Sequence, residues 1–189
     1  MASDKVEATA STTKGGIPGV RGVEHVGINV PDLEEATRFF VDVLGAEVYY
    51  SIGPFKDETG NWLADNLDVH PRAEIPEIRI LRLKNGAHFE LLSFIAPDQN
   101  KTMPKFSDYD GHHIAFYVDD MEAAVAYLKS KGVKVLGPVK DGVGPESGES
   151  SAFVHFKSPW GAMFELVSFP KGRLYEQEHE PMWTPDQVS

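Results

Sequence analysis

The sequence contains no cysteine. This absence excludes disulfide scaffolds, thiol nucleophiles, iron–sulfur clusters and zinc sites built from cysteine. Any metal ion must therefore be bound by His, Asp or Glu side chains. Long apolar runs are also missing, and none approaches the roughly 20 residues that a membrane-spanning helix needs. No membrane is expected as a partner.

Positive charge is scarce, because 18 Lys and Arg residues stand against 29 Asp and Glu residues, which gives a net charge of −11. A chain this acidic repels polyanions unless it carries a local basic patch, and the sequence shows no such patch. Nucleic acid is therefore excluded as a partner, and highly anionic substrates such as coenzyme A esters are disfavoured. The stretch from Met1 to Lys14 lacks the apolar segment of a secretory signal, so a cytoplasmic location is expected.

The remaining composition is that of a soluble globular protein, with 41% hydrophobic and 25% charged residues among 189. Residues 1–21 are small and polar and predict a disordered leader. We expect one folded domain over 22–170. The tail, 171–189, is charged and interrupted by proline but holds several large apolar residues, so we expect it to dock on the domain or on a partner subunit.

An internal repeat organises this domain. The segment EHVGINVPDLEEATRFFVDVLGAEV is similar to HHIAFYVDDMEAAVAYLKSKGVKV, and each copy reads strand, acidic helix start, helix, glycine, strand. The pair Asp119 and Glu122 predicts the start of the second helix, as the corresponding Asp-x-x-Glu motif does for the first. Gly45 and Gly132 stand where each helix must end in a left-handed turn.

The later strands repeat as well, because HFELLSF matches MFELVSF. Each of these segments follows an alternating strand and a glycine-containing turn. The sequence therefore predicts an α+β fold of two tandem βαβββ modules. Module 1 covers 23–95, a polar linker covers 96–110, and module 2 covers 111–169.

Four chemically active side chains occupy equivalent positions in the two modules. Side chains alternate across a strand, so each strand has one face for its helix and one for the opposite, concave side. If the aliphatic residues face the helices, the concave face receives His25 and Glu90 from module 1 and His113 and Glu165 from module 2. Each alone is more readily explained as a solvated strand residue. Because a carboxylate in an apolar strand is costly to bury unpaired, the symmetric set of four predicts a divalent metal: Zn, Ni, Co, Mn or Fe(II).

The motifs EHVGINV, HFELLSF, GHHIAFYV and SPWGAMFELVSF resemble those of the vicinal oxygen chelate superfamily. This superfamily contains glyoxalase I, methylmalonyl-CoA epimerase, extradiol dioxygenases and the bleomycin and fosfomycin resistance proteins. The resemblance covers about 23–169. It implies that the modules curl into a U-shaped sheet around a divalent metal, with the ligand positions on His25, Glu90, His113 and Glu165. This His/Glu/His/Glu set is similar to that of the bacterial glyoxalase I type.

The resemblance implies a glyoxalase-like lyase or isomerase that acts on a small substrate with adjacent oxygens. In such chemistry a metal acts as a Lewis acid while a carboxylate abstracts a proton next to a carbonyl. By family analogy Glu165 is the first choice for this base, with Glu90 as ligand or second base. Two alternatives stay open: an Fe(II) ring-cleaving dioxygenase of the extradiol type, and a non-enzymatic resistance protein that binds a small molecule. A homodimer is common in these families and is expected here.

Four further residues are candidates for contact with substrate, although packing or solvent contact explains them about as well: Asn29, Tyr117, His155 and Trp62. His155 has the strand parity to point into the cup. Trp62 lies in an insertion of module 1, SIGPFKDETGNWLADNLDVHPRAEIP, which we expect to cap the cup or to pack on a second subunit. His88 and His112 neighbour the motifs and are expected to be structural.

Overall fold

The computed structural model describes residues 17–185, so most of the predicted leader and the last four residues of the tail lie outside the described chain. Module 1 forms a unit with these elements: β1 (His25–Asn29), α1 (Leu33–Arg38), the π-helical turn η1 (Phe39–Val43), β2 (Glu47–Ile52), β5 (Ile78–Arg82) and β6 (His88–Leu92). The insertion between β2 and β5 contains β3 (Phe55–Lys56), α2 (Trp62–Leu67) and β4 (Glu74–Ile75).

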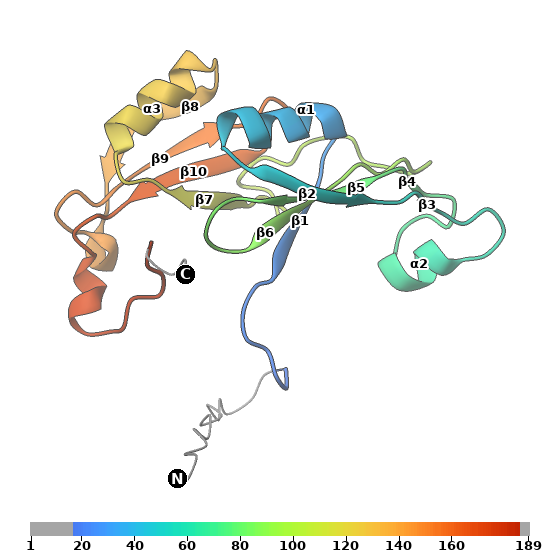
Figure 1. The fold of residues 1–189 in the computed structure, drawn as a ribbon, viewed down its shortest axis with the longest axis horizontal. Coiled ribbons are helices and arrows are strands. Elements are labelled where there is room, and N and C mark those ends of the chain that lie inside the picture. The colour runs from blue at the N-terminus through green and yellow to red at the C-terminus, as the bar shows by residue number, and fades with distance from the viewer. Residues whose placement is uncertain (1–16, 186–189) are drawn as a thin grey trace, which may run out of the picture.

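Module 2 repeats the unit without this insertion (Figure 1). Its elements are β7 (His113–Tyr117), α3 (Met121–Ser130), β8 (Lys134–Asp141), the short 3-10 helix η2 (Gly144–Glu146), β9 (Ala152–Lys157) and β10 (Met163–Ser168). The tail that follows contains a second 3-10 helix, η3 (Leu174–Gln177).

Each module forms its own four-stranded sheet, in the orders β1-β6-β5-β2 and β7-β10-β9-β8. β1 pairs parallel with β6, and β7 pairs parallel with β10, whereas the other neighbours are antiparallel. The predicted α+β class with two tandem βαβββ modules is confirmed. The two sheets are hydrogen-bonded separately, so among the described strands they do not form one continuous sheet.

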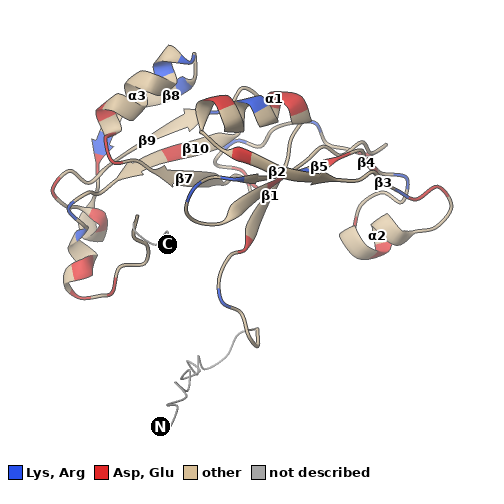
Figure 2. Cartoon of the chain, in the orientation of Figure 1, with Lys and Arg blue, Asp and Glu red and all other residues tan. Residues whose placement is uncertain are grey.

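The helices of the two modules lie on the same side of the sheets, and the C-terminal segment runs on the opposite side (Figure 1). Acidic and basic residues both occur along α1, and charged residues are scattered over the outer loops (Figure 2). None of the helices in the described chain is long and apolar enough to cross a membrane.

The helix boundaries follow from local hydrogen bonding. Asp32 caps α1, where its carboxylate accepts a hydrogen bond from the backbone N–H of Glu35 at 2.8 Å. The expected start of the second helix was wrong by one residue, because Asp120 rather than Asp119 caps α3 and accepts from the backbone N–H of Ala123 at 3.0 Å. The extended backbone of Asp120 directs its side chain over the first helical turn.

The glycines predicted to end the helices are confirmed in that role. Gly45 follows η1 with a φ of 78°, and Gly132 follows α3 with a φ of 75°. Both values lie in the left-handed region, where a residue with a Cβ atom is strained.

The larger of two hydrophobic cores joins the modules behind the two sheets. Phe39 and Phe40 of η1 project onto module 2, where their ring centroids lie 6.0 and 6.1 Å from that of Phe164. Phe89 of β6 similarly lies 6.1 Å from Phe116 of β7. The side chains that each module turns toward its helix therefore also hold the modules against each other.

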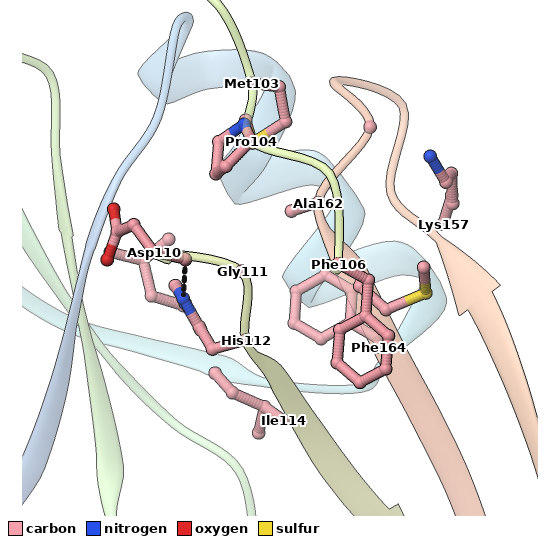
Figure 3. A pocket seen from close by; sticks show the side chains of 13 residues that line it. Met103, Pro104, Phe106, Asp110, Gly111, His112, Ile114, Lys157, Ala162 and Phe164 are labelled. Carbon is pink, nitrogen blue, oxygen red and sulfur yellow. Dashed lines mark hydrogen bonds between the residues drawn. The ribbon is translucent and has the colours of Figure 1, made fainter. Parts of the chain in front are cut away.

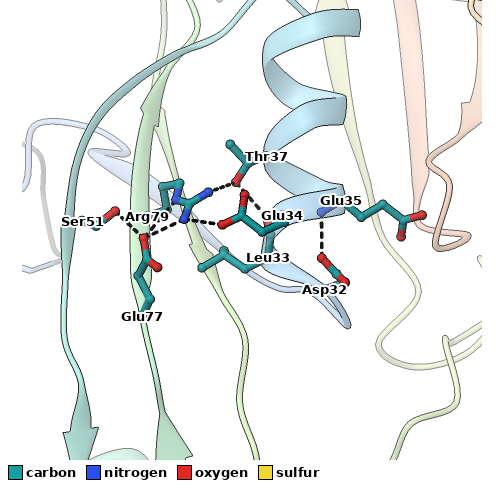
Figure 4. Close-up of polar contacts among 8 residues, drawn as sticks. All are labelled: Asp32, Leu33, Glu34, Glu35, Thr37, Ser51, Glu77 and Arg79. Carbon is teal, nitrogen blue, oxygen red and sulfur yellow. Dashed lines mark hydrogen bonds and ion pairs between the residues drawn. The ribbon is translucent and has the colours of Figure 1, made fainter.

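A charged network fastens α1 to the sheet of module 1 (Figure 4). The guanidinium of Arg79 on β5 donates to Glu34 and Glu77 at 2.8 Å each and to the Thr37 hydroxyl at 2.9 Å. The hydroxyl of Ser51 on β2 donates to Glu77 at 2.6 Å. The hydrogen bond from Ser51, together with that from Arg79, lowers the pKa of Glu77.

Replacing Glu77 by Gln is expected to lower the free energy of unfolding at pH 7 by about 1 kcal/mol, because the partly exposed carboxylate loses its ionic partners. A lowered native pKa stabilises the fold above the unfolded value, about 4.3, and this contribution is lost as the pH falls through the native value. Urea unfolding should therefore show a lower stability of Glu77→Gln than of the wild type at pH 7. Below the lowered native pKa of Glu77 the two proteins should be equally stable. The exposed control Glu178→Gln should match the wild type, and a Glu77→Gln effect that persists unchanged in acid would refute the explanation.

Candidate metal and substrate site

The His and Glu of module 1 lie on neighbouring strands. Glu90 of β6 is in register with Gly27 of β1, and His25 precedes Gly27 by two residues on the same face. The Nε2 atom of His25 lies 3.7 Å from Oε2 of Glu90. The glycine between them leaves the Glu90 carboxylate uncovered, since it places no side chain on this face.

Glu24 and His88 extend this pair into a larger cluster. Oε2 of Glu24 lies 2.5 Å from Nδ1 of His25, and Oε1 lies 3.3 Å from Nε2 of His88. The hydrogen bond to Glu24 raises the pKa of His25, and the same bond lowers the pKa of Glu24. A carboxylate on Nδ1 leaves Nε2 of His25 as the atom directed to Glu90.

Sequence reasoning missed this role of Glu24 and assigned His88 a structural one. The strand register reveals this cluster, because His88 stands opposite His25 in the parallel pair of β1 and β6. Glu24 precedes His25 directly in the chain. The alternation of side chains along one strand does not reveal the contact between Glu24 and His88, because Glu24 precedes β1 and His88 belongs to β6.

The equivalent pair in module 2 is closer. Nε2 of His113 lies 3.0 Å from Oε2 of Glu165, and Nε2 of His155 lies 3.7 Å from the other carboxylate oxygen. His155 stands directly opposite Glu165 in the register of β9 and β10. Glu165 is thus held between two imidazoles, with only 12% of its side chain exposed.

The ligand atoms of His113, His155 and Glu165 all lie within 4.8 Å of one another, as do those of Glu24, His25 and His88. Two donor atoms each about 2.1 Å from a tetrahedral zinc ion are about 3.4 Å apart. The separations of 3.0 and 3.7 Å around Glu165 bracket this value. The donor set and its spacing therefore fit a divalent metal.

The structure brings the four predicted ligands together in two pairs, one for each module. Over residues 17–185, none of the groups of three or more potential ligands within this spacing combines residues of both modules. A centre that uses His25, Glu90, His113 and Glu165 at once stays a prediction.

A groove of about 1310 Å³ follows the module 2 pair. His113, His155 and Glu165 line it together with aromatic side chains and one arginine: Tyr117, Phe153, Phe169, Trp183 and Arg173. A few polar groups among apolar walls are typical of sites for small molecules. The alternation of side chains along the strands predicted Tyr117 and His155 on this face, whereas Arg173 and Trp183 come from the tail.

A second cavity, of about 40 Å³, lies beneath the linker (Figure 3). Its lining includes Met103, Pro104 and Phe106 of the linker and His112. Nδ1 of His112 lies 2.9 Å from the backbone carbonyl of Asp110. The cavity is far too small for an organic substrate, and His112 fastens the linker at the start of β7.

The other residues predicted to contact substrate, Asn29, Tyr117 and Trp62, lie in different surroundings. The side-chain carbonyl of Asn29 accepts a hydrogen bond from the backbone N–H of Phe94 at 3.3 Å. Tyr117 packs between Phe169 and Trp183, with centroid distances of 4.9 and 5.2 Å. Trp62 begins α2, is 53% exposed, and is not part of the lining found for the groove among the described residues.

The insertion packs on the concave side of module 1. Phe55 of β3 and Ile75 of β4 belong to a small core with Ile78 and Ile80 of β5. Ile80 stands opposite Glu90 in the register of β5 and β6. The insertion thus covers the sheet next to the His25 and Glu90 pair.

Two repeated βαβββ units, each with a His and a Glu side by side on parallel strands, define the vicinal oxygen chelate architecture. The family model described as "Glyoxalase/Bleomycin resistance protein/Dioxygenase superfamily" matches residues 24–153. The chain belongs to this superfamily. Its members typically bind divalent metals, and the resemblance inferred from the motifs is confirmed.

Among curated proteins, the chain is 42% identical to a 2-epi-5-epi-valiolone epimerase of an Actinomyces species, over 87% of this chain and 88% of the relative. It is 30% identical to an ethylmalonyl-CoA/methylmalonyl-CoA epimerase of Cereibacter sphaeroides, over 76% of this chain and 95% of the relative. The crystal structure of a glyoxalase family protein from Bacillus cereus has the same fold, with a TM-score of 0.59, 19% identity, and coverage of 81% of this chain and 98% of the other. The epimerase relatives confirm the expectation of an enzyme.

Proposed function

We propose that this chain is a divalent-metal-dependent epimerase that inverts a stereocentre next to a carbonyl group. The observation that carries the proposal is the placement of Glu165 against His113 and His155, where a nearly buried carboxylate adjoins two imidazoles. The epimerase relatives support isomerisation over the lyase and dioxygenase alternatives.

The proposed metal ligands are His25, Glu90, His113 and Glu165. A divalent ion bound there supplies Lewis-acid stabilisation to the negative charge that develops on the substrate oxygens. Because the two pairs form separate groups in one chain, we infer that a homodimer completes the centre by setting module 1 of one subunit against module 2 of its partner. The exposed side chains of Tyr50 and Ile52 on the edge strand β2 support such an interface.

In the proposed reaction, a carboxylate oxygen of Glu165 takes the proton from the carbon beside the carbonyl, and the electron pair of the C–H bond passes into the enediolate. A proton carried by Glu90, once this carboxylate has left the metal, would go to the opposite face of the same carbon. His155, 3.7 Å from Glu165, orients the base toward the substrate. The low exposure of Glu165 keeps bulk water away from the transferred proton.

The substrate in this proposal is 2-epi-5-epi-valiolone or a compound closely similar to it. The 42% identity to the valiolone epimerase exceeds the 30% identity to the coenzyme A epimerase. The net charge of −11 also opposes the binding of an anionic coenzyme A ester.

Purified protein loaded in turn with Mn, Co, Ni, Zn and Fe(II) tests the proposal. Incubation with 2-epi-5-epi-valiolone should produce the second epimer, detected by nuclear magnetic resonance. The absence of epimer with every metal would overturn the assignment. Oxygen uptake with Fe(II) and a catechol would instead indicate a dioxygenase, and tight binding of an aromatic molecule that a chelator leaves unchanged would indicate a binding protein.

A further inference from the structure

We infer that two segments outside the modules flank Glu165 at the ends of the module 2 groove and favour a compact polyhydroxylated ring ketone between them, with Trp183 of the tail as the specificity-determining residue. This inference rests on the proposed function, because it assigns the substrate class of the same site. It depends on four features of the groove: the Trp183 wall, the Arg173 guanidinium, the Phe106 end and the distance from Glu165 to the wall.

The first feature is a wall of three aromatic rings. The Trp183 ring lies 5.2 Å from Tyr117 and 6.2 Å from Phe169, and these two rings are 4.9 Å apart. Tyr117 and Phe169 belong to the face of the sheet that carries His113 and Glu165. Flat aromatic surfaces pack well against the C–H faces of a ring-shaped ligand.

Hydrogen bonds hold this part of the tail against both modules. The side-chain amide of Asn85, in the turn between β5 and β6, donates to the backbone carbonyls of Thr184 and Pro185 at 3.4 and 3.3 Å. The backbone N–H of Leu174 donates to the carbonyl of Ser147 at 2.7 Å. The tail is therefore attached to module 1 directly after Trp183 and to module 2 at Leu174, before Trp183.

Arg173 supplies a polar group beside the aromatic wall. Its guanidinium carbon lies 4.0 Å from the ring centroid of Phe169, and Glu146 accepts a hydrogen bond from it at 3.1 Å. Its Nε atom is buried and has no hydrogen-bond partner among the described residues. A buried N–H without an acceptor is uncommon in proteins, and a hydroxyl or carbonyl oxygen of a ligand would satisfy it.

The linker lies at the opposite end of the groove. The ring of Phe106 lies 5.2 Å from His113 and 5.8 Å from His155. An aromatic side chain thus adjoins the reacting groups on the side away from Trp183.

The distance from the base to the aromatic wall sets the size of the ligand part that fits between them. Glu165 is in register with Ala115, and Tyr117 follows two residues later on the same face. At about 3.3 Å per residue, the base and the aromatic wall are separated by about 7 Å along the strand. This spacing accommodates one six-membered ring with its hydroxyl groups. A coenzyme A ester with its reacting carbon beside Glu165 would have to run its long arm past Phe106 or Trp183.

Kinetics of the metal-loaded protein with 2-epi-5-epi-valiolone test the role of Trp183. Trp183→Ala should raise KM about tenfold and change kcat less, because the ring contacts the substrate away from the reacting carbon. Trp183→Phe should restore KM to within about threefold. Met182→Ala, at an exposed position in the same segment, serves as the matched control and should behave like the wild type.

A binding measurement separates this inference from the proposed function. In metal-free protein, 2-epi-5-epi-valiolone should quench tryptophan fluorescence, the quench should vanish in Trp183→Phe, and methylmalonyl-CoA should cause none. Quenching without turnover would contradict the proposed function and support a ring-binding site at Trp183. An unchanged KM in Trp183→Ala, or equal quenching by methylmalonyl-CoA, would overturn the inference.

Discussion

Replacing Glu165 by Gln is expected to lower kcat about 1,000-fold, because the amide keeps the size of the side chain but cannot accept the proton. The amide oxygen can still face His113 and His155, so the fold should be retained. Steady-state kinetics at saturating substrate, with the divalent metal in excess, measure the change. Circular dichroism of the variant checks that the sheet of module 2 is intact.

Glu178→Gln provides the matched control, since Glu178 is an exposed residue of the tail. It should leave kcat within about twofold of the wild-type value. If Glu165→Gln retained more than a tenth of wild-type kcat with metal bound, another group would have to be the base.

Replacing Phe164 by Ala is expected to lower the free energy of unfolding by about 4 kcal/mol, because it empties a large space in the shared core. Phe164 is only 2% exposed and packs against Phe39 and Phe40 of module 1. It also stacks on Phe156 of its own module, with a centroid distance of 5.6 Å. Urea unfolding followed by circular dichroism measures the loss.

The same experiment tests whether the modules form one cooperative unit. Both modules should unfold in a single transition in the wild type and in the variant, because Phe164 contacts both. The fully exposed Tyr109 provides a control, and Tyr109→Ala should change the stability by less than about 0.5 kcal/mol. Two separate transitions, of which only one shifts, would contradict the shared core.

The repeat and the strand parity predicted the fold because they are local properties of the chain. A period of two fixes which side chains share a face, and this placed His113 and Glu165 side by side without knowledge of the tertiary structure. The shift of the helix cap from Asp119 to Asp120 was not predictable in this way. Both residues are good caps, and the backbone conformation decides between them.

The rest of the site depends on contacts between segments far apart in the chain. Phe106 and Trp183 come from the linker and the tail, whose composition predicts loops but not where they dock. Glu24 reaches His88 because β1 and β6 are neighbours, which only the pairing of strands reveals. The packing of the modules, within one chain or between two, sets the distance between the two His and Glu pairs, and the repeat carries no information about it.

The most direct test of the account is proton exchange in deuterium oxide. We claim that a carboxylate moves a proton at the carbon next to the carbonyl, with a divalent metal bound. Metal-loaded protein should exchange that proton of 2-epi-5-epi-valiolone for deuterium as the epimer forms, and proton magnetic resonance should show the signal disappear. Exchange should stop after chelation and slow about 1,000-fold in Glu165→Gln. Epimer formation without any deuterium at that carbon would contradict the account.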